Sequence, residues 1–274
     1  MKRNLMTISV IGIILFASLV AAVNILASDN SIDIEALTVA NQLYNTGSYA
    51  EAAQMYEQLL SQGIVNSTLY YNLGNAYYVQ GDPGRAILNY QRAARLDPRD
   101  PDIRANLALV RAQSAHETIN EPNSPLQSLA NFTSSWLTLD ETALLSLVLW
   151  FLIGFLVLTY RQFQPGKILT LTQYGLILAT LIFLVAGISF GCRLYAEHTR
   201  PEAVIIAEQV TINSSPGDEF ATDFHLASGT EVELIDIQGS WAHLALPNDI
   251  LDGWIPLSTI ETVSLKEATG LPTF

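Results

Sequence analysis

Few side chains in this sequence are of the kind that performs chemistry, and they are scattered. Cys192 is the only cysteine, so neither a disulfide nor a cysteine zinc site can form within the chain. The adjacent acids Asp218 and Glu219 follow a Pro-Gly pair, as solvated turn residues do. The four histidines lie in different regions of the chain: His116, His198, His225 and His243.

The sequence also lacks several motifs that bind phosphates, dinucleotides or zinc. It contains no Gly-x-x-x-x-Gly-Lys loop, no Gly-x-Gly-x-x-Gly fingerprint and no His-Glu-x-x-His helix. We therefore predict no catalytic residues, no cofactor and no metal site. The protein is expected not to be an enzyme, and its function must rest on binding.

The composition favours a membrane protein. Of the 274 residues, 50% are hydrophobic and only 14% are charged, whereas an average soluble chain has about 25% charged residues. The formal net charge is −13, and residues 201–274 carry twelve acids and one base, Lys266. Because no basic tract is present, a nucleic-acid partner is not expected.

The start of the chain has the features of a secretory signal. Lys2 and Arg3 are followed by an apolar run at about residues 8–26. Small residues near the end of this run, among them Ala22, offer cleavage sites. Residues 1–27 are predicted to be either a cleaved signal peptide or a retained N-terminal anchor.

Two further apolar segments predict a helical hairpin in a membrane. Residues 142–160 are uncharged and long enough to cross about 30 Å of hydrocarbon as a helix. The second segment covers residues 168–192, and Pro165 and Gly166 break the helix between the two. A transmembrane hairpin is expected within residues 138–196.

Cations flank these apolar segments asymmetrically. Lys2 and Arg3 precede the first segment, and Arg161 and Lys167 lie in the turn of the hairpin. Because cytoplasmic loops are enriched in lysine and arginine, these four residues are predicted to be inside. We therefore expect a multi-pass protein of a bacterial cytoplasmic membrane, with both soluble regions on the outer side.

The region before the hairpin contains an internal repeat. Residues 67–100 resemble the tetratricopeptide repeat, a pair of antiparallel helices of about 34 residues. The signature positions of that family are occupied by Tyr70, Leu73, Gly74, Tyr77, Gly81, Ala86, Tyr90, Ala93 and Pro98. Residues 33–66 fit the same register less closely, and residues 101–115 match a first helix only, as in a cap. The resemblance implies an α-helical solenoid domain at residues 28–118, followed by a linker at 119–137.

The same resemblance implies a binding face. In tetratricopeptide-repeat proteins the inner face of each first helix usually receives a peptide or a partner helix. By register, this face would present five residues: Asn41, Tyr44, Tyr71, Asn75 and Tyr78. The two asparagines recur one repeat apart and can grip a peptide backbone. The alternative is that some of the tyrosines only pack the surface.

After the hairpin, residues 202–264 show short alternating runs and turn signals, which predict an all-β domain. Gly-Ser-Trp ending at Trp241, and Gly-Trp-Ile-Pro around Trp254, resemble bacterial SH3-like domains. The resemblance implies a small SH3-like barrel, with residues 265–274 as a tail. The two tryptophans are candidate residues of a ligand-binding surface; the alternative is that they close the core of the barrel.

The whole order of signal, repeats, membrane hairpin and SH3-like domain is similar to the BatE-type proteins of bacterial aerotolerance clusters. Companions in such families are membrane proteins with von Willebrand A domains and a cytoplasmic AAA+ ATPase. The resemblance implies a multidomain membrane protein that acts as a scaffold or adaptor and assembles an envelope complex with protein partners. An alternative function is a cell-wall module that binds peptidoglycan and recruits a hydrolase.

Overall fold

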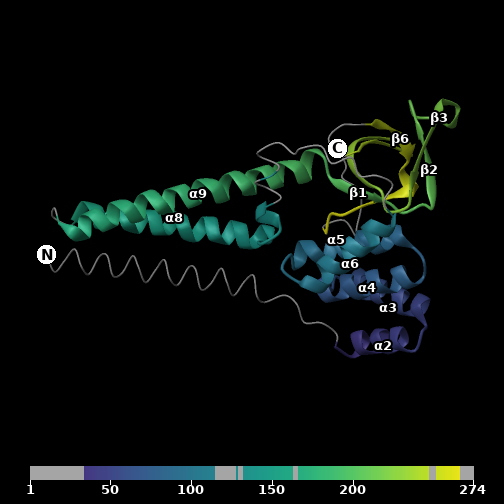
Figure 1. The fold of residues 1–274 in the computed structure, drawn as a ribbon, viewed down its shortest axis with the longest axis horizontal. Coiled ribbons are helices and arrows are strands. Elements are labelled where there is room, and N and C mark those ends of the chain that lie inside the picture. Colours follow the sequence, from purple (N-terminus) through teal and green to yellow (C-terminus); the bar gives the residue numbers. More distant parts are fainter. Residues whose placement is uncertain (1–33, 115–127, 129–131, 163–165, 247–250, 266–274) are drawn as a thin grey trace. The chain divides into compact units, whose positions relative to one another are not determined.

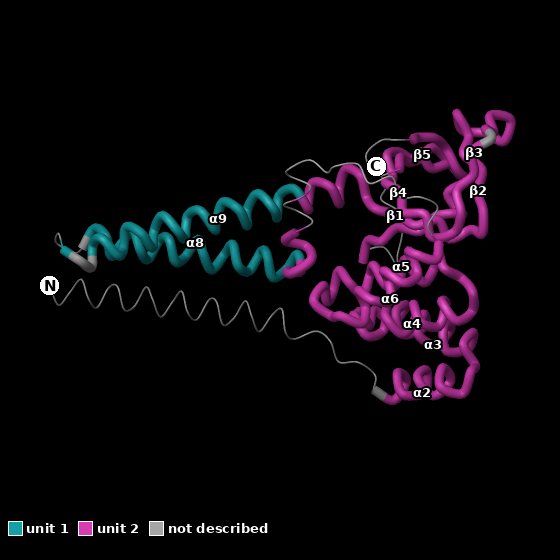
Figure 2. The backbone as a smooth tube through the Cα atoms, in the orientation of Figure 1, with its two compact units in different colours: residues 1–30, 139–192 teal, residues 31–138, 193–274 magenta. Residues whose placement is uncertain are grey.

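The structure is a computed structural model that divides into two compact units (Figure 2). The described residues are 34–114, 128, 132–162, 166–246 and 251–265. Among them, residues 139–192 belong to the first unit and the others to the second. The predicted signal or anchor at residues 1–27, most of the predicted linker and nearly all of the predicted tail lie outside the described residues.

Residues 34–114 fold into consecutive helices that pack against their neighbours in the chain (Figure 1). They are α2 (Ile34–Asn45), α3 (Tyr49–Ser61), α4 (Ser67–Val79), α5 (Pro83–Leu96) and α6 (Pro101–Ser114). Two helix pairs are thus followed by a single helix. This arrangement confirms the predicted helical repeat region.

Local sequence signals set the ends of these helices. The side chains of Asn66 and Asp82 cap α4 and α5, each accepting a hydrogen bond from the backbone N–H three residues later, at 2.8 and 2.9 Å. Gly47 and Gly81 adopt left-handed φ angles of 86° and 81° in the turns that close each helix pair. Glycines at equivalent positions of the two repeats therefore give the two turns similar backbone geometry.

The second helix pair depends on one close approach. A Cβ atom added at Gly74 of α4 would lie 2.8 Å from two ring carbons of Tyr90 on α5. Ala86, one turn before Tyr90, is fully buried. Small residues at these two positions therefore let the aromatic ring fill the space between the helices, as expected from the sequence.

The described part of the first unit consists of the long apolar helix α8 (Leu139–Gln162) and of the long apolar helix α9 (Lys167–Thr199) as far as Cys192. Their 24 and 33 residues correspond to about 36 and 50 Å, at 1.5 Å per residue. Both are long and apolar enough to cross a membrane, and the predicted spans 142–160 and 168–192 lie within them. The second helix continues past Cys192 because no breaker occurs before Pro201.

Residues 202–262 form an antiparallel sheet, and we call residues 202–265 the β module. The strands are β1 (Glu202–Ile205), β2 (Gln209–Asn213), β3 (Ala221–Ala227), β4 (Glu231–Gln238), β5 (Trp241–Ala245), β6 (Asp252–Pro256) and β7 (Ile260–Thr262). Their order is β3-β2-β6-β5-β4-β1-β7, and β3 and β7 at its two ends do not pair with each other within the described residues. The predicted all-β domain is confirmed at the level of an antiparallel sheet.

The described part of the sheet has seven strands. The first apolar run divides into β1 and β2, because the backbone turns between Ile205 and Gln209. There the N–H of Ile206 donates to the carbonyl of Thr259 at 2.9 Å instead of continuing a ladder. Turns at Gly229 and Gly239, both with positive φ, bracket β4 as predicted.

The β module packs on the repeat helices within the second unit. Ile87, Leu88 and Tyr90 of α5 form one buried apolar cluster with Val204 and Val263 of the β module. The apolar area removed from water by such a cluster is the main source of its stability. Residues that precede α8 and residues that follow α9 in the sequence therefore share a core.

Glycines permit this close packing. The backbone N–H of Gly84, at the start of α5, donates to Oγ of Ser228 at 3.1 Å. A Cβ atom at Gly84 would lie only 2.5 Å from this oxygen and from the carbonyl oxygen of Ile205. A Cβ atom at Gly229 would lie 2.8 Å from Cδ1 of Ile87. Larger side chains at either glycine would push the β module away.

Ion pairs surround this contact. They are Arg92–Glu261 at 2.9 Å, Arg95–Glu202 at 2.9 Å and Arg111–Glu231 at 2.5 Å. Arg92 is the most buried of the three arginines, with its side chain 11% exposed, and its guanidinium also lies over the ring of Tyr70. Exposed pairs contribute little, about 0–1 kcal/mol each, whereas removing a partner of the buried Arg92 guanidinium would leave a buried charge unpaired.

Candidate functional site

A hydrogen-bond network of uncharged side chains lies on the inner side of the first repeat. Oδ1 of Asn41 on α2 accepts hydrogen bonds from the hydroxyl of Tyr56 at 2.6 Å and from Nδ2 of Asn72 at 3.1 Å. The three residues come from α2, α3 and α4, so the network joins the first helix pair to the second. It fixes the orientation of the Asn41 amide.

The second repeat carries the same network. Oδ1 of Asn75 accepts hydrogen bonds from the hydroxyl of Tyr90 at 2.6 Å and from Nδ2 of Asn106 at 3.0 Å. The donors lie 15 and 31 residues after the acceptor, as they do in the first repeat. We call Asn41, Asn72, Asn75 and Asn106, with their tyrosine partners, the asparagine ladder. It runs from α2 through α4 to α6.

Burial keeps the tyrosine donors protonated. Burial, with a smaller contribution from Tyr44, raises the pKa of Tyr56 to about 12. The pKa of Tyr90 is also raised, mainly by burial. Because both phenols stay neutral at physiological pH, they donate to the asparagine oxygens. Among the described residues no acceptor contacts Nδ2 of Asn41 or Asn75, so these amide groups retain donors for a ligand.

A pocket of about 270 Å³ opens between the helices at this point. Its lining is almost entirely amide and phenol: Asn41, Tyr44, Asn45, Tyr56, Asn72 and Asn75. The ring of Tyr44 packs edge-on against Tyr49, with 5.1 Å between centroids. The pocket is uncharged, and it offers donors and acceptors at short range to any chain segment that enters.

The five residues predicted for this face are only partly brought together. Asn41, Tyr44 and Asn75 line the pocket. The hydroxyl of Tyr71 accepts from Nδ2 of Asn106 at 3.1 Å and so adjoins the second network. The hydroxyl of Tyr78 donates to Oε1 of Gln113 at 3.1 Å and is not among the pocket residues.

The sequence interpretation missed Asn45, Tyr56 and Asn72, which also line the pocket. A signal for two of them was present in the sequence. Tyr56 and Tyr90, like Asn72 and Asn106, are separated by the same interval as Asn41 and Asn75. Comparing the two repeats position by position would therefore have identified the whole ladder, whereas Asn45 has no equivalent asparagine in the second repeat.

The two tryptophans of the β module lie on the outward face of the sheet. Trp241 pairs with Pro256 and His243 pairs with Trp254 across β5 and β6, while the intervening Ala242 is fully buried. Strand side chains alternate between faces, so both indole rings lie opposite the core. Both are half-buried rather than fully buried.

The two indole rings have different neighbours. Trp254 stacks on His243 with 4.7 Å between ring centroids, and Nε2 of His243 lies 3.1 Å from Oδ2 of Asp252. Trp241 instead lines an open groove of about 560 Å³. The other groove residues are Asp218, Ser240, Pro256, Leu257 and Ser258.

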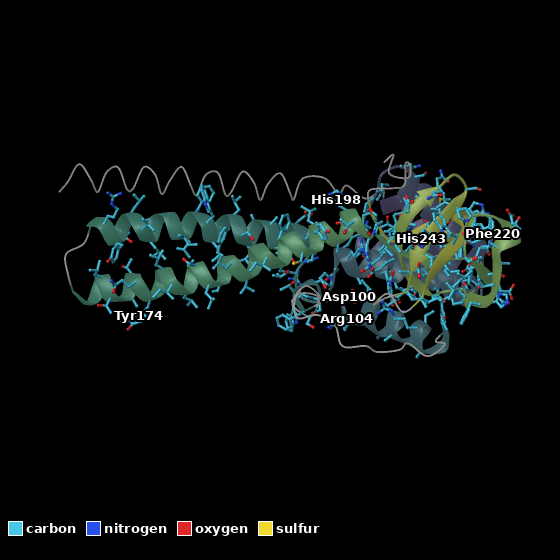
Figure 3. All side chains as sticks on the ribbon, turned by 90° about the horizontal axis from the view of Figure 1, so that it is seen from above. Asp100, Arg104, Tyr174, His198, Phe220 and His243 are labelled. Atoms are coloured by element: carbon cyan, nitrogen blue, oxygen red, sulfur yellow. The ribbon has the colours of Figure 1, made fainter. Side chains whose placement is uncertain are left out.

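The histidines in the described part of the chain lie far apart in the sequence and on different elements. Within the described residues no cluster of three or more His, Cys, Asp or Glu side chains is placed to hold a metal ion. His198 lies near the end of α9, whereas His243 lies in the β module (Figure 3). The spacing Gly-x-Ser-x-Gly occurs at residues 187–191, but it lies inside the continuous helix α9. A nucleophile elbow requires a sharp strand-to-helix turn.

The repeat region resembles a known protein family. No curated protein matches this chain. The family model of the tetratricopeptide repeat matches residues 37–114. This segment covers the helices that carry the asparagine ladder and the pocket. The N-terminal region is thus of the tetratricopeptide-repeat type, a class of module that generally mediates contacts between proteins.

Proposed function

We propose that this protein is a membrane-anchored, non-enzymatic scaffold that binds a segment of a partner protein in the pocket of its repeat region. The observation that carries the proposal is the uncharged pocket lined by Asn41, Tyr44, Asn45, Tyr56, Asn72 and Asn75. It lies within the segment that matches the tetratricopeptide repeat. That class of module generally binds proteins.

The chemistry of the pocket suits an extended peptide. Amide side chains both donate and accept, as the peptide backbone does. The volume of about 270 Å³ is slightly below the range of roughly 300–1,000 Å³ usual for small-molecule sites. A side chain with its flanking backbone fits this space, and the absence of lysine and arginine among the lining residues disfavours recognition of a free carboxylate.

We further propose that both soluble regions lie outside the cytoplasmic membrane. Lys2, Arg3, Arg161 and Lys167 support a cytoplasmic position for the chain start and for the hairpin turn. The contacts of Gly84 and Arg92 with the β module support a common side for the repeats and the sheet. Residues 138–196 then serve as the anchor, and residues 1–27 as a signal peptide or additional anchor.

The β module is proposed to be an SH3-like domain at residues 202–264. The Gly-Ser-Trp and Gly-Trp-Ile-Pro sequences support this assignment, as do the neighbouring positions of β5 and β6 that bear Trp241 and Trp254. The outward position of both rings favours the predicted ligand surface over the alternative that they close the core. The open groove beside Trp241 is its most accessible part.

In biological terms we propose an envelope scaffold of the aerotolerance type, whose partners include von Willebrand A domain membrane proteins. This step rests on the similar order of segments in BatE-type proteins. The alternative, a peptidoglycan-binding module that recruits a hydrolase, has a direct test. Retention of residues 201–274 on purified cell wall would favour it, and absence of retention would favour the scaffold.

The pocket itself can be tested by filling it. Asn45 lines the pocket, whereas Gln42 is an exposed residue of the same helix outside the lining. Asn45→Trp is expected to abolish crosslinks between the repeat region and its partners in native membranes, measured by mass spectrometry, while Gln42→Trp keeps them. Equal crosslinking by both variants would show that partners do not use this pocket.

A further inference from the structure

The acidic charge of the β module is neutralised on one side only. Residues 201–265 contain no lysine or arginine. The carboxylates near the repeats and the end of α9 are paired with arginines from outside the module: Glu202 with Arg95, Glu231 with Arg111, Glu233 with Arg200 and Glu261 with Arg92. By contrast, Asp218 and Glu219 of the short helix η1 (Asp218–Phe220) pair with no arginine or lysine among the described residues.

Two exposed aromatic side chains follow these unmatched acids closely in the sequence. Phe220 ends η1 and is 43% exposed, and Phe224 on β3 is 62% exposed. They are the only large apolar side chains that are exposed in the described part of the β module. Figure 3 places Phe220 at the end of this module. The described part of this acidic module thus exposes two phenyl rings within five consecutive residues, 220–224, and no other large apolar side chain.

The backbone holds Phe224 in this outward position. Thr211 pairs with His225 and Asn213 pairs with Ala221, so Ile212 alone faces residues 222–224 across a β-bulge. Bulges redirect side chains and are often functional features of edge strands. The exposed ring therefore results from a defined irregularity in the strand.

One hydroxyl stabilises the bulge on both strands. Oγ1 of Thr222 donates to the carbonyl of Ile212 at 2.7 Å and accepts from the N–H of Phe224 at 3.2 Å. It replaces ladder bonds that the bulge interrupts. The position of Phe224 thus depends on a side chain that does not itself form the exposed surface.

We propose that η1 and the bulge of β3 form a third interaction surface, which binds a partner protein bearing lysine or arginine next to an apolar pocket. Phe224 provides the anchor, and Asp218 and Glu219 pair with the cations. Binding hot spots commonly consist of a central aromatic side chain surrounded by a rim of other contacts. Asp218 also lines the groove beside Trp241, so this surface adjoins the proposed ligand surface of the β module. Its test is independent of the repeat pocket.

Charge complementarity selects this occupant over two others. Bacterial and other anionic bilayers repel carboxylates at their surface, which disfavours insertion of Phe224 into lipid. The β module of a second copy would bring Asp218 and Glu219 against equally acidic groups, because residues 201–265 contain no lysine or arginine. A cationic protein surface would be repelled by neither the lipid nor the acidic groups, and it would attract Asp218 and Glu219.

The test uses the full chain in nanodiscs of zwitterionic lipid and three short fluorescent peptides. One alternates lysine with leucine, one replaces the lysines by glutamate and one replaces the leucines by serine; empty nanodiscs give the background. Only the lysine–leucine peptide is expected to bind. Phe224→Ala should weaken its affinity by roughly tenfold, the size of loss typical of a truncated aromatic anchor.

Matched control variants distinguish binding at this surface from non-specific effects of net charge and of exposed apolar area. Phe132→Ala removes a phenyl ring that is 66% exposed outside the β module, and it should leave binding unchanged. The pair Asp218→Asn and Glu219→Gln should reduce binding and its salt dependence, whereas Glu208→Gln with Asp236→Asn, an equal loss of charge, should have a much smaller effect.

The bulge provides a second test that leaves the aromatic ring in place. Thr222→Val should weaken binding, and Thr222→Ser, which keeps the hydroxyl, should not; thermal melts establish that each variant is folded. Wild-type affinity in Phe224→Ala overturns the proposal. It is equally overturned if no peptide binds while vesicles containing phosphatidylglycerol bind in a Phe224-dependent manner, since the surface would then be a lipid contact.

Discussion

The guanidinium of Arg92 donates a hydrogen bond of 2.6 Å to the backbone carbonyl of Thr262, which lies 170 residues further along the chain. Both α8 and α9 lie between these two residues in the sequence. If these helices cross a membrane, a contact between Arg92 and Thr262 requires both flanking regions to be on the same side. The packing of the second unit thus restricts the topology independently of the charges near the apolar segments.

The first prediction concerns this topology. Reporter fusions within residues 28–135 and within residues 200–274 are expected to report an extracytoplasmic position, and a fusion at residue 164 a cytoplasmic one. Paired alkaline phosphatase and fluorescent-protein fusions measure both states. A cytoplasmic signal at residue 120 would contradict the proposed orientation, and opposite signals on the two sides of the hairpin would contradict the packing.

The second prediction tests the contact between the β module and the repeats. Gly84→Ala would place a Cβ atom 2.5 Å from the carbonyl of Ile205 and from Oγ of Ser228. Overpacking of this kind costs about 1–3 kcal/mol, so the melting temperature of the solubilised full chain should fall. Gly187→Ala is the control, because nothing lies within 4 Å of a Cβ atom there.

The third prediction tests the register of the repeats. Gly74→Leu should force the ring of Tyr90 out of its position, because even a Cβ atom would lie 2.8 Å from two ring carbons. We expect a loss of about 1–3 kcal/mol, with Gly74→Ala intermediate, measured by thermal melts of the full chain. An unchanged melt in Gly74→Leu would mean that the helices do not touch at this residue.

The fourth prediction follows from the buried phenol of Tyr56. Its pKa rises from 10.0 in the unfolded chain to about 12 in the folded protein, chiefly because of burial. A raised folded-state pKa stabilises the fold fully below the unfolded pKa, and this contribution is lost as the pH rises through the folded pKa. The free energy of unfolding should therefore decrease between pH 10 and pH 12.

Tyr56→Phe tests the assignment of that pH dependence. The variant should be less stable at neutral pH, because Oδ1 of Asn41 loses one of its two donors. Its stability should also decrease less steeply above pH 10, measured by denaturant titration at each pH. A slope equal to that of the wild type would assign the alkaline destabilisation to other groups, among them Tyr90, whose pKa is raised in the same direction.

The elements that the sequence predicted well are those specified by local signals. Gly47 and Gly81 fix turns that only a few residues determine, and the uncharged run at residues 142–160 is sufficient to indicate a long apolar helix. The asparagines at positions 41 and 75 were selected because they recur in register, and the structure places both in the lining of one pocket, while their role in binding stays a prediction. Each of these inferences uses neighbours in the chain or a fixed period.

The contacts that the sequence did not reveal join distant segments. The hydrogen bond of Gly84 with Ser228 spans 144 residues, and no motif marks either residue as a partner of the other. Likewise, Tyr56 looks like an ordinary core aromatic until α2 and α3 are packed together. Its hydroxyl then reaches Asn41, which gives that asparagine a role in packing as well as its proposed role in binding.

The shared core of α5 and the β module has a consequence for biosynthesis. Ile87 and Leu88 are made well before Val204 and Val263, which share their apolar cluster. At the usual translation rate of about 5–20 residues per second, the repeats wait roughly 10–30 seconds for the β module, and transiently exposed apolar surface promotes aggregation and proteolysis during such delays. A ribosome that stalls within α8 or α9 would therefore leave a nascent chain whose last repeat helices are folded but not covered by the β module.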